Sequence, residues 1–215
     1  MTSRIALCCR QTRPMKLVKS VVGFVPFVLF SVLLLFTGAG TAAGISALVA
    51  AAVVIATRRD GIKIVPAAQG VLLLGVTTLS VTGGPGVDAI LIKYAAGAVA
   101  LLLGLFLVAS AAAMPFTAQL SRSTVPEAAW HSPQFLQVNR RISTAWGSAT
   151  IVLGICHLAG AETGNQGGQL VLRLAINWVV PVVACLVANA YTKHQVAQAR
   201  QLIAQAHHRM QEKAA

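Results

Sequence analysis

Acidic side chains are scarce in this sequence. The 215 residues include five Asp and Glu against 17 Lys and Arg, and only 10% of all residues are charged. A soluble domain carries roughly 25% charged residues, so most of this chain is not expected to face water. No two of the acids form a close pair suited to acid–base catalysis or metal binding. We therefore predict that the protein is not an enzyme. The acids are Asp60, Asp88, Glu127, Glu162 and Glu212.

Cysteine patterns and catalytic motifs are also missing. The four cysteines, Cys8, Cys9, Cys156 and Cys185, have no zinc-site spacing and imply no disulfide framework. We find no phosphate-binding glycine loop, nucleophile elbow or metal-binding His-Glu motif. Haem ligation is disfavoured, because His157 has no second histidine in another apolar run. We expect no metal and no cofactor.

Long apolar runs are what the sequence does contain, since 56% of the residues are hydrophobic. Runs of about 20 apolar residues are long enough to cross a bilayer as helices. They predict an all-α, polytopic membrane bundle with six transmembrane helices. Gly/Pro-rich TGGPGVD at 82–88 predicts a turn, and Pro26 inside the first run predicts a kink. The expected spans are 17–36, 39–57, 62–81, 87–110, 132–160 and 170–191.

The distribution of basic residues predicts the orientation. Fifteen of the 17 Lys and Arg residues fall in the segments that this scheme places on one side, and only Lys93 and Arg173 fall on the other. Because Lys and Arg mark cytoplasmic loops, we predict a multi-pass protein of the cell inner membrane with both termini in the cytoplasm. A net charge of +12 in a soluble protein would indicate nucleic acid. Here we expect the phospholipid bilayer as partner and no nucleic acid.

Three parts are expected along the chain: a basic cytoplasmic N-terminus (1–16), the transmembrane domain (17–192) and a cytoplasmic helical tail (193–215). Thr124 and Glu127 fit a capping box, which predicts a short amphipathic helix containing Trp130 on the membrane surface between spans four and five. The fifth span should begin at Ser132. Amphipathic and cationic side chains just before it and in its first half are predicted to anchor it at the membrane interface. These are Trp130, Arg140, Arg141 and Trp146.

Lys93, Arg173 and His157 are the candidate binding residues, because each lies near the outer end of its span. Two interpretations of the two cations stay open. Their side chains could reach to the lipid phosphates and anchor the helices. Alternatively, they could turn inward with His157 and form an outward-facing cationic pocket for an anionic headgroup or a small anion. Polar side chains inside spans are predicted to hydrogen-bond between helices. They are Gln69, Asn177, Trp178 and Asn189.

Four stretches together resemble the intracellular septation protein A family of small multispanning bacterial inner-membrane proteins. They are FVPFVLF at 24–30, ILIKY at 90–94, WHSPQFLQVNRRISTAW at 130–146 and LVLRLAINW at 170–178. The resemblance covers about residues 20–192 and implies a role in envelope maintenance or septation. It places the family's basic positions on Lys93 and Arg173, where Arg173 departs from the expected lysine.

Three functions fit these observations. The first is a non-enzymatic scaffold or assembly partner of the inner membrane, which would bind a membrane protein or a second copy of itself. The second is a small transporter or anionic-lipid-binding protein that uses the outward-facing cationic pocket. The third is an accessory subunit of a larger membrane complex. A polar cavity near the midplane would favour the second over the other two.

Overall fold

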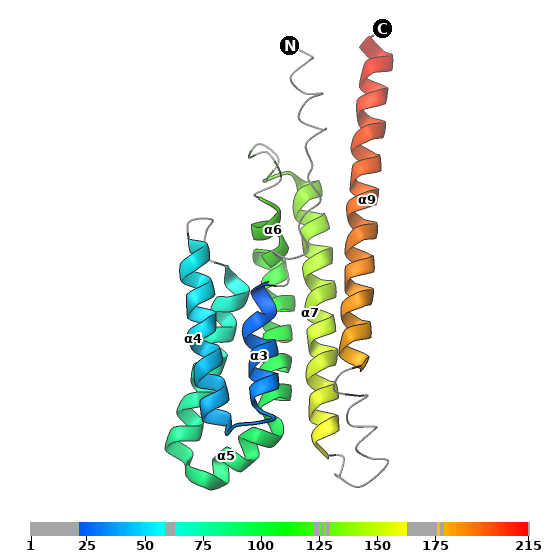
Figure 1. Ribbon diagram of the computed structural model, residues 1–215. Helices are drawn as coiled ribbons and strands as arrows, with labels where there is room; N and C mark the ends of the chain where they lie inside the picture. The colour runs from blue at the N-terminus through cyan, green and yellow to red at the C-terminus, as the bar shows by residue number, and fades with distance from the viewer. Residues whose placement is uncertain are drawn as a thin grey trace.

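The computed structural model describes residues 22–58, 63–122, 125, 127, 130–162, 176 and 179–214. This part of the chain folds into helices and contains no strand (Figure 1). The elements, in chain order, are η1 (Val22–Phe24), α3 (Val25–Leu33), α4 (Ala39–Thr57), α5 (Ile64–Ala113), α6 (Phe116–Ser121), α7 (Pro133–Glu162) and α9 (Val180–Ala214).

Three of these helices, α4, α5 and α7, are long and apolar enough to cross a membrane. Their outward-facing surfaces are also apolar: Leu48, Val71 and Val81 are among many large hydrophobic side chains that stay exposed. A soluble protein does not expose contiguous apolar surface of this kind, whereas lipid solvates it well. The all-helical, membrane-compatible architecture predicted from the sequence is therefore confirmed.

The long helix α5 reverses direction at Gly84. Gly84 has φ 73° and ψ −174°, a backbone conformation outside the helical region, and Pro85 follows it. The two arms, 64–83 and 85–113, then run side by side, because Val65 packs in one cluster with Leu103 and Leu107 (Figure 1). The turn predicted at 82–88 is thus present, and α5 supplies two antiparallel helices.

The proline predicted to kink the first span lies elsewhere in its helix. Pro26 falls in the first turn of α3, immediately after the short 3-10 helix η1. At this position a helix has no intrahelical partner for the backbone N–H, so proline costs nothing there. The change from 3-10 to α geometry at Val25 takes the place of the expected kink. Residues 17–21 of the predicted first span lie outside the described part.

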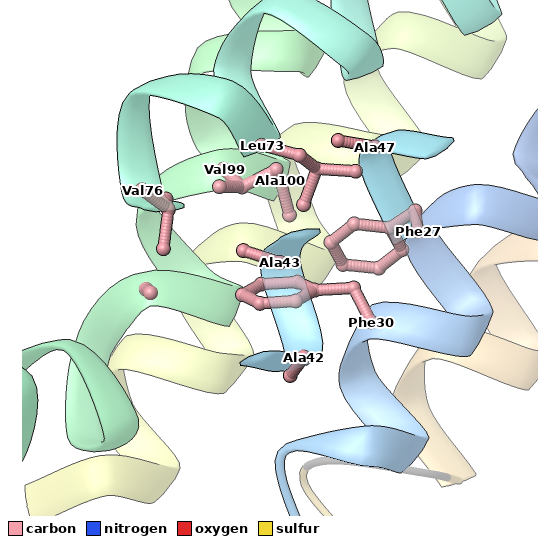
Figure 2. Packing of buried hydrophobic residues seen from close by; sticks show 10 residues of the cluster. Phe27, Phe30, Ala42, Ala43, Ala47, Leu73, Val76, Val99 and Ala100 are labelled. Atoms are coloured by element: carbon pink, nitrogen blue, oxygen red, sulfur yellow. The ribbon is translucent and has the colours of Figure 1, made fainter. Parts of the chain in front are cut away.

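The core is built from two phenylalanines that insert against small side chains. Phe27 and Phe30 of α3 point between α4 and the two arms of α5 (Figure 2). The face of α4 that meets them contains only Ala and Ser among its buried residues. Because these side chains are small, α3 and α5 approach α4 closely. The buried residues of α4 are Ala39, Ala42, Ala43, Ser46, Ala47 and Ala50.

Four glycines join the second arm of α5 to α7, and we call them the glycine seam: Gly97 and Gly104 on α5, Gly147 and Gly154 on α7. On each helix the two glycines are seven residues apart, so they share one face. A Cβ built on Gly154 would lie 2.5 Å from the backbone nitrogen of Leu101. One built on Gly104 would lie 2.7 Å from the backbone nitrogen of Ile151. The two helices are therefore in contact backbone to backbone.

The side-chain amide of Gln69 is buried without a hydrogen bond in the described part of the chain. Gln69 in the first arm of α5 is 0% exposed, and neither side-chain polar atom has a hydrogen-bond partner in the described part of the chain. The interhelical hydrogen bond expected for Gln69 is thus not found there. Asn177 and Trp178 lie outside the described residues. An unpartnered buried amide carries its full desolvation cost.

We predict that Gln69→Leu raises the melting temperature of the purified protein. Leucine of similar size removes the unpartnered amide, and the gain should be about 1–3 kcal/mol. The matched control is Gln119→Leu, because Gln119 Oε1 accepts a hydrogen bond from the Ile64 N–H at 3.2 Å. That control should lower the melting temperature. A lower melting temperature for both variants would show that the Gln69 amide has a hydrogen-bond partner.

Candidate functional site

Lys93, the first predicted binding residue, forms an ion pair. Its Nζ lies 3.4 Å from Oε2 of Glu162, the last residue of α7. The hydroxyl of Tyr94 donates a hydrogen bond to the other carboxylate oxygen of Glu162. Both charged side chains are largely open to the surroundings, at 43% and 64% exposure. Lys93 therefore has a local counter-charge, which the sequence interpretation did not assign.

His157 faces a different neighbour. Its ring meets the ring of Phe27 edge-on, with centroids 6.4 Å apart and planes at 89°. Phe27 belongs to the buried cluster around α3, so His157 contributes to packing between α3 and α7. The described contacts do not join His157 to Lys93, and Arg173 lies outside the described residues. The outward-facing cationic pocket stays a prediction.

Both tryptophans predicted at the membrane interface donate hydrogen bonds within the protein. The indole N–H of Trp146 donates to Thr192 Oγ1 at 3.2 Å, and its ring stacks on Phe24 with centroids 5.9 Å apart. Trp146 thereby ties α7 to α9 and to η1. It is half-buried, so its ring still reaches the surface that was predicted to meet the headgroups.

Trp130 lies in a turn and not in the short helix predicted for it. Its indole N–H donates to the carbonyl of Val125 at 2.9 Å, and the guanidinium of Arg122 lies 5.2 Å from the ring centroid. These contacts hold Trp130 against the chain between α6 and α7. The helix described within the connector is α6, which starts earlier at Phe116. The capping residue Thr124 lies outside the described part.

Helix α6 packs into the bundle through a buried hydrogen-bond network. Thr117 donates from its hydroxyl to the carbonyl of Asn139 at 2.9 Å, and its backbone N–H donates to Ser143 Oγ at 3.3 Å. The Ser121 hydroxyl donates a hydrogen bond to Asn139 Oδ1 at 3.2 Å. These polar contacts fix α6 against α7, and the amphipathic surface helix expected around Trp130 stays a prediction.

Arg140 and Arg141, the two predicted anchors at the start of α7, line a hollow between α7 and α9. The hollow has a volume of about 380 Å³. Arg140, Arg141, Thr144 and Ser148 are exposed side chains of α7. Thr144, Ser148 and Tyr191 were not singled out from the sequence. Thr144 and Ser148 follow the arginines along α7 at helical spacing, whereas only the pairing of α7 with α9 brings the Tyr191 hydroxyl beside the hollow. The lining residues are Arg140, Arg141, Thr144, Ala145, Ser148 and Tyr191.

Metal chemistry has no evident site in the part of the chain that can be described. No group of three or more His, Cys, Asp or Glu side chains gathers within it. The expectation of a protein without metal, cofactor or enzymatic activity stays a prediction.

Comparison with known proteins leaves the family open. The chain matches no protein-family model, no curated protein and no solved structure. The resemblance to the intracellular septation protein A family therefore remains a prediction from the residues, while the fold and the polar contacts above stand on the chain itself.

Proposed function

We propose that this chain is a multi-pass protein of the cytoplasmic membrane that acts as a non-enzymatic scaffold or assembly partner in envelope maintenance or septation. The proposal includes six crossings, with both termini in the cytoplasm. The observation that carries it is helix α9. It continues without interruption from Val180 to Ala214 and extends well beyond the start of α7 (Figure 1). At about 1.5 Å per residue, its 35 residues make a rod of about 52 Å.

The arrangement of the helix ends supports the orientation. The end of α4, the start of α7 and the polar half of α9 lie at one end of the bundle, and the Gly84 turn lies at the other (Figure 1). The first of these ends carries Arg58, Arg140 and Arg141, whereas the Gly84 turn carries Asp88. This distribution agrees with cytoplasmic placement of the basic end.

The two halves of α9 have different chemistry, as a membrane-anchored docking rod needs. The first half exposes Val182, Val183, Leu186 and Val187, which suits lipid or another apolar helix. The second half, 192–214, is rich in Gln, His, Lys and Arg and suits water. A partner that binds this second half would be held at a fixed height above the membrane.

Packing in the rest of the molecule favours a scaffold over a transporter. The second arm of α5 is in close contact with α7 through the glycine seam, and Lys93 forms an ion pair with Glu162. A transporter requires a polar path near the midplane. His157, which was predicted to belong to the outward-facing pocket, packs against an aromatic ring.

Complementation in cells that lack the endogenous protein tests the scaffold. A chain ending at Lys193 should insert in the membrane but fail to restore normal division under envelope stress. The variant with Lys93→Gln and His157→Gln should restore it, because a scaffold does not use the cationic pocket. The opposite result, rescue by the shortened chain and failure of the double variant, would overturn the proposal. Membrane levels of both variants are compared by immunoblotting.

A further inference from the structure

One face of α7 changes in character along its length. Arg140 and Arg141 stand at the start, and the hydroxyls of Thr144 and Ser148 follow at helical spacing. One and two turns further along are Val152 and Ile155, both exposed apolar side chains. The face therefore offers cationic groups first, then hydroxyls, then hydrocarbon.

Helix α9 contributes a second side, which changes from a hydroxyl to apolar side chains. The hydrogen bond from Trp146 to Thr192 fixes the register of the two antiparallel helices. It places the hydroxyl-bearing Tyr191 beside the hollow of about 380 Å³. From Tyr191, successive turns of α9 away from its polar half carry the exposed Val187 and Val183. Both walls thus become apolar in the same direction.

The two arginines have no protein counter-charge in the described ranges. The ion pair found there joins Lys93 to Glu162, which is the far end of α7 from Arg140 and Arg141. A guanidinium group binds phosphate oxygens bidentately, and the hydroxyls beside it can donate to the same group. The hollow is within the size range of small-ligand sites. Its chemistry is complementary to a phosphate that is attached to a hydrocarbon chain.

We propose that the groove between α7 and α9 binds an anionic phospholipid of the leaflet that Arg140 and Arg141 face. The phosphodiester lies between the two guanidinium groups and the Tyr191 hydroxyl. One acyl chain runs along Val152 and Ile155 of α7 and along Val187 and Val183 of α9. Free phosphate would leave these apolar walls unused. The site requires that α7 and the apolar half of α9 lie in the membrane, and it is separate from the predicted pocket around Lys93.

Lipid retention measures this directly. The full-length protein is placed in nanodiscs of phosphatidylcholine with a minor fraction of phosphatidylglycerol, extracted in mild detergent, and its bound lipid is counted by mass spectrometry. The wild type should retain phosphatidylglycerol preferentially. The double variant Arg140→Gln with Arg141→Gln should lower that preference about tenfold, since each cation near a membrane surface attracts anionic lipid. Short-chain phosphatidylglycerol should displace the retained lipid, and inorganic phosphate should not.

The matched control is Arg58→Gln with Lys63→Gln, which removes the same charge near the α4–α5 connection and should keep the preference. Ser148→Phe leaves both arginines in place but fills the groove, so it should also lose the preference. If the arginine variant is poorly folded by thermal melting, Ser148→Phe and Tyr191→Phe decide. Retention in every groove variant overturns the proposal. Equal loss in the control, or displacement by inorganic phosphate alone, overturns it too.

Discussion

Gly154→Ala should destabilise the protein by about 1–3 kcal/mol, the usual cost of inserting a methyl group into a packed core. The new Cβ would lie 2.5 Å from the backbone nitrogen and 2.8 Å from the Cα of Leu101. Backbone atoms cannot rotate away as a side chain can, so α7 must separate from the second arm of α5. The melting temperature and the midpoint of denaturation in detergent measure this loss.

The control for Gly154→Ala is Gly75→Ala. Gly75 lies in the first arm of α5, and a Cβ there would meet no atom within 4 Å. Because alanine has the higher helix propensity, this variant should be neutral or stabilised by up to about 1 kcal/mol. Equal stability of the two variants would mean that the α5–α7 contact is looser than the glycine seam implies.

Gly84→Ala should disrupt the reversal of α5. With φ 73° and ψ −174°, Gly84 occupies a region that is nearly restricted to glycine, so an L side chain should cost about 1–3 kcal/mol. The turn also sets the position of Asp88, which accepts a hydrogen bond from Ser80. A displaced turn would lose that bond as well as the packing between the two arms. Thermal unfolding and limited proteolysis at 82–88 should both report the change.

Gly86→Ala is the matched control for this turn. Gly86 is two residues away, does not have a positive φ, and a Cβ there would meet no atom within 4 Å. We therefore expect wild-type stability and the wild-type proteolysis pattern. If Gly84→Ala behaves in the same way, the turn can adopt another backbone conformation without loss.

The helix boundaries were largely predictable from local sequence. The predicted second span, 39–57, coincides with α4, and the fifth, 132–160, differs from α7 by one or two residues at each end. Apolar runs and Gly/Pro turns are local signals, so no tertiary information was needed. The effect of Pro26 was predicted wrongly, because proline kinks a helix in its middle but is tolerated in its first turn. The apolar run alone did not show where the helix begins.

The candidate site was predicted less well, because its residues come from different helices. Arg140 and Arg141 were identified from charge and position, but Thr144, Ser148 and Tyr191, which line the same hollow, were not. Lys93 was also identified, yet its partner Glu162 is 69 residues away in the chain. Which side chains meet across helices depends on the rotation and register of each helix, and one sequence does not reveal either.

The sequence by itself determined the class of the protein, since hydrophobic length and charge placement decide whether a chain enters lipid. Only the tertiary structure decided which glycines form the α5–α7 contact, which acid neutralises Lys93, and that α7 and α9 together line a hollow beside Arg140 and Arg141. Insertion into a membrane depends on the composition of each segment. Contacts between segments depend on the angle at which one helix presents its face to another.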